Sequence, residues 1–282
     1  MASLWFTLQW REFLFVKFPP FNNMHLPSRS DRGPAAWGDA FRARYGMKSP
    51  AIIRPMQTKM TLSQILRGIL GLVVFILVWF GIAGRLAWVQ GWAFLLAFIA
   101  YVSGLVWRLS KLNPELVRER NQPAEKAEPW DRVLMGIYMV ILVILWVVTA
   151  LDGGRYRWSS VPLGIQLVGW LLLILACLLI WHVMMTNAYL SSWARLQEDR
   201  GQVVVQEGAY RWIRHPMYLG IILAFLGIPL ALGSWWGMIP SVVIIGLFVY
   251  RTYREDLMLI HGLAGYAEYT QNVRYRLLPG IW

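Results

Sequence analysis

Cysteine is nearly absent from the 282-residue sequence, which contains only Cys177. A single thiol supports neither a disulfide framework nor a cysteine-based metal site. The four histidines, His25, His182, His215 and His261, are scattered without the spacing of metal ligands. We therefore predict that the protein binds no metal ion, and that Cys177 and His182, both within an apolar run, are packing residues.

Charged residues are also scarce, at 15% of the sequence, whereas hydrophobic residues make up 57%. This balance excludes an ordinary soluble domain. A membrane-spanning helix needs about 20 apolar residues, and four runs reach that length. These runs cover residues 62–83, 86–109, 132–151 and 162–187, and two further runs that are shorter or interrupted by Gly or Pro follow at 216–233 and 235–253. The sequence predicts an all-α, polytopic membrane bundle of five to six transmembrane segments.

The last two apolar runs are joined by only Leu232, Gly233, Ser234 and Trp235. So short a connection favours two antiparallel helices that pack against each other. We predict a C-terminal helical hairpin, and its two outer ends should lie on the same side of the membrane.

Basic residues are distributed unequally between the two sides of the predicted bundle. Loops 110–131 and 188–215 and the tail after residue 250 carry four each, whereas the opposite loops together carry three. Because Lys and Arg near span ends remain on the cytoplasmic side, both termini are predicted to be cytoplasmic. The net charge of +12 has the same origin, together with a basic N-terminal stretch, and no nucleic-acid-binding motif accompanies it.

Residues 1–59 show neither helical nor strand periodicity and carry nine basic residues against three acidic ones. We predict a basic, poorly ordered extension. Alternatives are a transit peptide, an arm on anionic lipid, or an upstream translation that precedes a natural start at Met60. Residues 60–282 are predicted to form one membrane-integral domain.

The heptapeptide RHPMYLG, residues 214–220, opens the first helix of the predicted hairpin. Proline is favoured at the first helical position, so Pro216 is predicted to begin this helix. Arg214 and His215 would then lie at a helix N-terminus, which binds anions such as carboxylates. Tyr218 would add an aromatic face one turn later. The alternative is that Arg214 and His215 only reach toward lipid headgroups.

A second polar cluster, residues 251–256, lies at the other end of the hairpin. The tight connection should bring Glu255 near His215. Arg251 and Glu255 are four residues apart and would share a helix face, so the alternative is an ordinary surface salt bridge between them. Upstream, the β-branched run from Gln202 to Val205 ends near Gly208, which predicts a short extended segment and a turn that line a cavity.

These residues match a known family. The segments VVVQEGAYRWIRHPMYLG (203–220), RTYREDLMLIHG (251–262) and YAEYTQNVRYRLLPGIW (266–282) together resemble the isoprenylcysteine carboxyl methyltransferase and phospholipid methyltransferase superfamily of membrane enzymes. The resemblance implies methyl transfer from S-adenosylmethionine (SAM), bound in a cytoplasm-facing pocket that the C-terminal segment covers. The motif region is 188–282, and the earlier spans agree only in general layout.

The resemblance also implies residue roles. Arg214, Arg251 and Glu255 would be catalytic, and Arg251 would bind substrate. Arg195 is a further candidate for substrate binding, because its segment, residues 191–197, should lie beside the pocket. The cofactor-binding set would be Gln202, Val203, Val204, Val205, Tyr210, His215, Pro216, Met217, Tyr218 and Glu255. Two positions depart from the family pattern: Ala209 stands where proline is usual, and Asp256 where a second glutamate is common. We expect the first to loosen the turn and the second to keep the charge.

The residue types suit this chemistry. An acid can hold the ammonium group of SAM, a helix N-terminus its carboxylate, and aromatic rings its cationic sulfonium. The acceptor would be a lipid or an isoprenoid or lipidated small molecule. A carboxylate nucleophile would need an arginine to hold it, and an amine would need a base such as Glu255 or Asp256. Chains of this layout suggest a bacterial inner membrane.

Two other functions stay open. Integral-membrane, NADPH-dependent reductases of the sterol type have a similar C-terminal region, but usually continue the motif as HPN followed by an acidic residue, where this chain has Met217 and Leu219. A non-catalytic membrane protein that retains the fold is the third reading. It predicts loss of the polar cluster, whereas Arg214, His215, Arg251 and Glu255 are all present.

Overall fold

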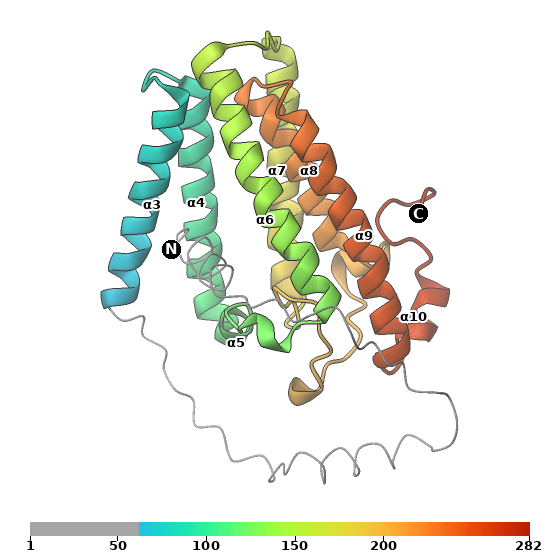
Figure 1. The fold of residues 1–282 in the computed structure, drawn as a ribbon. Coiled ribbons are helices and arrows are strands. Elements are labelled where there is room, and N and C mark those ends of the chain that lie inside the picture. The colour runs from blue at the N-terminus through green and yellow to red at the C-terminus, as the bar shows by residue number, and fades with distance from the viewer. Residues whose placement is uncertain (1–61) are drawn as a thin grey trace, which may run out of the picture.

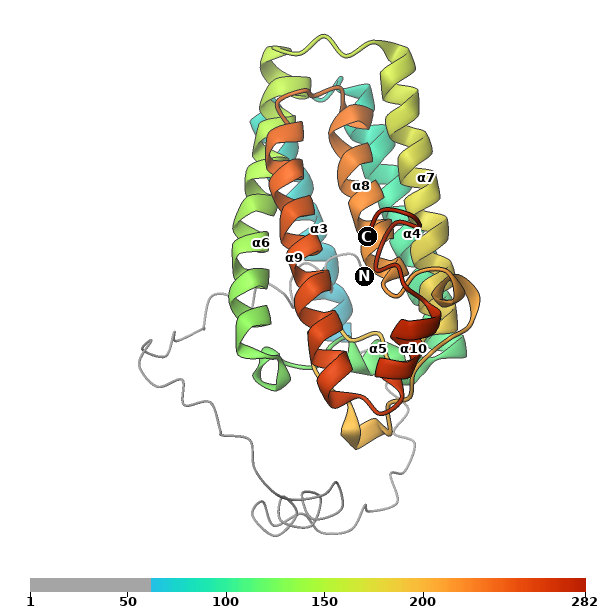
Figure 2. The same cartoon turned by 90° about the vertical axis from the view of Figure 1, so that its right-hand side faces the viewer.

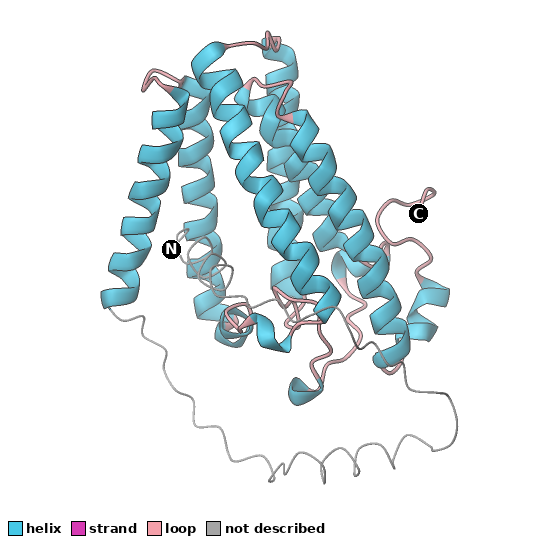
Figure 3. Cartoon of the chain, viewed as in Figure 1, coloured by secondary structure: helices cyan, strands magenta, loops and turns pink. Residues whose placement is uncertain are grey.

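The computed structural model describes residues 62–282, and every regular element in that range is helical (Figures 1 and 3). The predicted extension at residues 1–59 lies outside the described residues. The long helices are α3 (Leu62–Ala83), α4 (Val89–Leu112), α6 (Pro129–Thr149), α7 (Leu163–Thr186), α8 (Pro216–Leu232) and α9 (Met238–Gly262). The short ones are α5 (Pro114–Glu119), η1 (Ala124–Lys126), the π-helix η2 (Ala150–Tyr156), η3 (Glu198–Arg200), η4 (Gly208–Arg211) and α10 (Tyr266–Asn272). The prediction of an all-α membrane bundle is confirmed.

Four segments of the described chain are long and apolar enough to cross a membrane: Leu66–Ala83, Val89–Leu112, Pro129–Tyr156 and Leu163–Thr186. Helix α8, with 17 residues, is apolar but shorter. It ends at Gly233, whose φ of +75° is the left-handed conformation that commonly terminates helices. Helix α9 then runs back beside α8, so the predicted hairpin is present (Figure 2).

The connections divide between the two ends of the bundle (Figure 1). The α3–α4, α6–α7 and α8–α9 turns share one end. Helices α5 and α10 and the loops around η3 lie at the other end. The loops rich in Arg and Lys therefore gather on one side, as the charge pattern requires, and their cytoplasmic location stays a prediction.

Close packing of α7 against α8 fixes the position of the hairpin. A Cβ atom added at Gly169 would lie 2.5 Å from the backbone nitrogen of Ala231, and one added at Gly227 would lie 2.7 Å from the carbonyl oxygen of Gly169. The two backbones thus approach as closely as glycine allows, which is a common way for membrane helices to associate.

A buried carboxylate holds the turn of the hairpin. Asp152, in the π-helix η2, is fully buried and accepts hydrogen bonds from the backbone and hydroxyl of Ser159, from the hydroxyl of Ser234 and from the backbone of Trp236, at 2.6–3.2 Å. Satisfied hydrogen bonds stabilise a buried acid. This network connects the C-terminal end of α6 to the α8–α9 turn. It therefore fixes the position of both helices of the hairpin relative to α6.

Candidate functional site

One cavity of about 1080 Å³ extends from the apolar interior of the bundle to its polar end. Its apolar part is formed by side chains such as Phe75, Phe94, Leu142 and Phe225. Of the residues predicted from sequence, the lining includes Arg195, Gln202, Val203, Val204, Val205, Tyr210, Arg214, His215, Met217, Tyr218, Arg251 and Glu255. Pro216 is buried but is not part of the lining.

The first turn of α8 has the predicted arrangement. The helix begins at Pro216, and His215 is the residue that precedes it. The rings of His215 and Tyr218 stack with centroids 5.8 Å apart. The hydroxyl of Tyr218 donates a short hydrogen bond to Glu255 of α9. The hairpin therefore places Glu255 beside the start of α8, as its tight connection predicted.

Arg214 anchors the C-terminal segment. Its Nε and Nη2 donate to the two carboxylate oxygens of Asp256 at 2.8 and 2.9 Å, and its Nη1 donates to the carbonyl oxygens of Val273 and Arg274, both at 2.8 Å. All three nitrogens of the guanidinium group are thus engaged. A role for Arg214 in positioning a nucleophile stays a prediction. Its contacts indicate instead that it positions the C-terminal segment.

Asp256 is the centre of this cluster, and the sequence had predicted it as a charge-conserving replacement and as a candidate base. Besides Arg214, it accepts hydrogen bonds from Nε of Arg276 at 2.8 Å and from the hydroxyl of Tyr266 at 3.0 Å, and it lies 3.2 Å from Nε2 of His215. Burial, reinforced by the charge of Asp256, raises the pKa of Tyr266, so its phenol remains a neutral donor. The sequence signal was the adjacent pair Glu255–Asp256, but pattern alone did not show which acid turns toward Arg214.

Arg251 pairs with a partner far away in the sequence. Its Nε and Nη2 donate to the two carboxylate oxygens of Asp131, at the start of α6, at 2.8 and 2.9 Å. Arg251 is only 5% exposed, so the alternative of a surface salt bridge with Glu255 is wrong. The guanidinium group also lies 5.5 Å from the ring centroid of Tyr218. Asp131 was not singled out from sequence.

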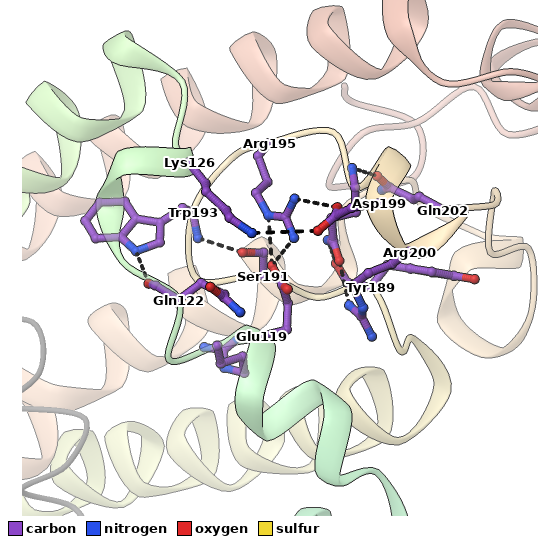
Figure 4. Close-up of polar contacts among 12 residues, drawn as sticks. Glu119, Gln122, Lys126, Tyr189, Ser191, Trp193, Arg195, Asp199, Arg200 and Gln202 are labelled. Carbon is purple, nitrogen blue, oxygen red and sulfur yellow. Dashed lines mark hydrogen bonds and ion pairs between the residues drawn. The ribbon is translucent and has the colours of Figure 1, made fainter. Parts of the chain in front are cut away.

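Arg195 belongs to a third charged cluster, at the polar end of the cavity (Figure 4). Its guanidinium group contacts Glu119 at 2.8 and 2.9 Å and Asp199 at 2.9 Å. Burial opposes ionisation, but hydrogen bonds with Asp199 and Glu119 outweigh it and raise the pKa of Arg195. The carboxylates of Glu119 and Asp199 thus already compensate the charge of Arg195. Substrate binding by Arg195 stays a prediction.

The segment before α8 lines the cavity without forming a paired strand. Residues 202–205 have no ladder partner in the described chain, so the predicted extended segment is unpaired. The predicted turn is the short helix η4, at which Gly208 has a φ of +58°. A Cβ atom there would lie 2.4 Å from Nε2 of His182. His182 therefore packs against the turn, in agreement with its predicted packing role.

Tyr210 is fixed from both sides. Its hydroxyl accepts a hydrogen bond from the amide of Asn187 at 2.8 Å, and its carbonyl oxygen accepts one from the hydroxyl of Tyr269 at 2.7 Å. Burial raises the pKa of Tyr210, so it presents a neutral aromatic ring at neutral pH. The turn also closes by a backbone hydrogen bond from Trp212 to Ala209 at 3.1 Å, and the expected effect of alanine at position 209 stays a prediction.

The fold and the site define a polytopic helical membrane protein with a large cavity that opens onto clustered charges. The sequence model of the isoprenylcysteine carboxyl methyltransferase (ICMT) family matches residues 167–261, from α7 to the end of α9. The resemblance predicted from the motifs is therefore confirmed over this segment, and it supports a membrane methyltransferase.

A solved structure described as the eukaryotic intramembrane Ras methyltransferase ICMT, without a monobody, is 15% identical to this chain. The match covers 99% of this chain and 96% of that one, with a TM-score of 0.43. The comparison with curated proteins gave no match. The described residues contain no group of three or more His, Cys, Asp or Glu side chains that could hold a metal ion.

Proposed function

We propose that the protein transfers a methyl group from SAM to a lipid or lipidated acceptor at the membrane. The observation that carries this proposal is one continuous cavity, which joins an apolar interior to the polar groups of Tyr210, His215, Tyr218 and Glu255. An acceptor with an apolar tail and a reactive head would span these two parts. The bilayer supplies the acceptor, and the charge pattern favours a cavity that opens to the cytoplasm.

The donor set fits SAM. Glu255 forms no ion pair within residues 62–282 and lines the cavity, so its carboxylate is available to an ammonium group. At the N-terminus of α8 the positive end of the helix dipole favours a carboxylate, although Pro216 has no N–H group and those of Tyr218 and Leu219 donate to the carbonyl oxygen of His215. The rings of Tyr210 and Tyr218 line the same cavity and can face a sulfonium cation. Residues 202–205 complete this part of the lining.

When bound, SAM supplies an electrophilic methyl group, and the protein aligns the nucleophile and excludes water. The Arg214–Asp256 pair holds the C-terminal segment against the start of α8, which closes this side of the cavity. Arg251 faces the cavity beside Tyr218 and orients the head of the acceptor. A carboxylate acceptor needs no base, whereas an amine acceptor would need one besides Glu255, whose carboxylate is assigned to the ammonium group of SAM.

Calorimetric titration of the detergent-purified protein with SAM tests this proposal. Loss of a charge-assisted hydrogen bond costs about 1.5–3 kcal/mol, so Glu255→Gln should weaken binding by about 10- to 100-fold. Glu268→Gln, an exposed glutamate of α10, is the matched control and should bind normally. Binding of NADPH in place of SAM would favour the reductase, and binding of neither ligand would favour a non-catalytic protein.

A further inference from the structure

Arg120 lies at the polar end of the cavity and belongs to none of the motifs. It directly follows α5, outside the segment that the family model matches. Its side chain lines the cavity, and its Nη1 makes one long hydrogen bond, of 3.4 Å, to the carbonyl oxygen of Leu190. Its own carbonyl oxygen accepts a hydrogen bond from the hydroxyl of Ser192 at 2.9 Å, which fixes the backbone.

The charge of Arg120 is uncompensated, unlike that of the arginines around it. Arg195, Arg214 and Arg251 each have a carboxylate partner within 3 Å. Among residues 62–282, Arg120 forms no ion pair. Burial, with a smaller contribution from the charge of Arg251, lowers the pKa of Arg120 to about 10. The group is still a cation at neutral pH, and a half-buried cation without a carboxylate partner is unfavourable.

Arg120 shares the cavity with residues of three other helices. Tyr101 of α4, Tyr218 of α8 and Arg251 of α9 are near enough to influence its ionisation. Tyr101 and Tyr218 line the same cavity. Arg120 therefore lines the same cavity as Tyr218 and Arg251, the two residues beside which the head of an acceptor is proposed to lie.

We propose that Arg120 binds an anionic oxygen group of the methyl acceptor, either a carboxylate or a phosphodiester, while the acceptor's tail lies in the apolar part of the cavity. This inference rests on the proposed function. SAM carries a sulfonium cation in addition to its zwitterionic amino acid head. Glu255 is suited to the ammonium group of that head. The positive charge left at Arg120 is then matched by an anion on the second substrate. A planar guanidinium group suits either oxyanion.

The test uses ligand pairs that differ in one charge. N-acetyl-S-farnesylcysteine and its primary amide probe the carboxylate, and a lysophosphatidylglycerol and a monoacylglycerol with the same acyl chain probe the phosphodiester. Calorimetric titration of wild type, Arg120→Gln, Arg120→Lys and Arg132→Gln in detergent gives each dissociation constant. Arg132 is an exposed arginine of α6 that does not line the cavity, so its variant is the matched control.

Wild type should bind at least one anionic ligand about tenfold more tightly than its neutral counterpart, as expected for one charge-assisted contact, and the responding pair identifies the oxyanion. Arg120→Gln should abolish the preference, Arg120→Lys should retain part of it, and Arg132→Gln should retain all of it. Unchanged SAM affinity in Arg120→Gln shows an intact fold and donor site.

A preference that survives in Arg120→Gln, or its absence from wild type, would overturn the proposal. Loss of SAM binding in Arg120→Gln would also overturn it, by assigning Arg120 to the donor. Failure of the proposed function would give a different result. The wild-type protein would then not bind SAM, whether or not it preferred one of the acceptor probes.

Discussion

Arg214 and Asp256 form a bidentate pair at 2.8 and 2.9 Å that joins the start of α8 to the C-terminal part of α9. Asp256 is fully buried and Arg214 is 6% exposed. Because Arg214 also donates to the carbonyl oxygens of Val273 and Arg274, the pair holds the C-terminal segment in place. The wall of the proposed donor site thus depends on contacts between three separate parts of the chain.

Replacing Asp256 with Asn should destabilise the protein strongly. The change leaves Arg214 and Arg276 without their shared counter-ion, and loss of one partner from a buried pair typically costs about 3–5 kcal/mol. Thermal unfolding in detergent should show a clear fall in Tm, whereas Glu268→Gln should leave Tm unchanged. Equal Tm values for Asp256→Asn and wild type would contradict the anchoring role.

The Asp131–Arg251 pair should behave as a unit. Asp131→Asn and Arg251→Gln each remove one partner of a bidentate, buried contact between α6 and α9. Each single change should destabilise the protein, and the double variant should cost clearly less than the sum of the two. Thermal or denaturant unfolding of the four proteins measures this coupling, and strictly additive effects would show that the pair contributes no joint stabilisation.

Gly208→Ala should weaken SAM binding because the turn before Tyr210 has no room for a methyl group. The new Cβ would lie 2.4 Å from Nε2 of His182, in addition to the strain of a positive φ. Gly201→Ala is a matched control, since Gly201 has a φ of +60° with no atom within 4 Å of its Cβ position. Calorimetry should show a larger loss for position 208, and His182→Ala should restore part of it. Equal losses of SAM affinity for Gly208→Ala and Gly201→Ala would contradict the steric explanation and leave only the strain of a positive φ.

Gly169→Val should disrupt the contact between α7 and α8. A Cβ at this position would meet the backbone nitrogen of Ala231 at 2.5 Å, which cannot move away as a flexible side chain would. Overpacking of this kind costs about 1–3 kcal/mol or more. Gly164→Val, in the same helix with open space around its Cβ position, controls for the substitution itself. A normal Tm for Gly169→Val would show that the two helices separate without cost.

The sequence predicted the helices well because each apolar run encodes its own span. The hairpin was also predictable, since a connection of four residues leaves few alternatives to antiparallel packing. Pro216 was placed correctly at the start of α8 because its preference for the first helical turn is local.

The partners of the charged residues were harder to predict. Asp131 and Arg251 are 120 residues apart, so their pairing depends on how α6 packs against α9. Glu255 and Asp256 are adjacent in sequence, but successive side chains of a helix point about 100° apart. Packing of α9 turns Asp256 toward Arg214 and Glu255 toward Tyr218. The charge on Arg120 gave no sequence signal, because it lies in a loop with other basic residues.

Methyl transfer that depends on Glu255 distinguishes a methyltransferase from the reductase and from a non-catalytic protein. The most direct measurement follows radiolabelled methyl groups from SAM into organic-extractable product, with purified protein in nanodiscs of bacterial lipid and added N-acetyl-S-farnesylcysteine. We predict labelling by wild type and by Glu268→Gln, with at least a tenfold fall in Glu255→Gln at subsaturating SAM. Equal labelling by Glu255→Gln and wild type, or no labelling and no SAM binding by wild type, would contradict the account.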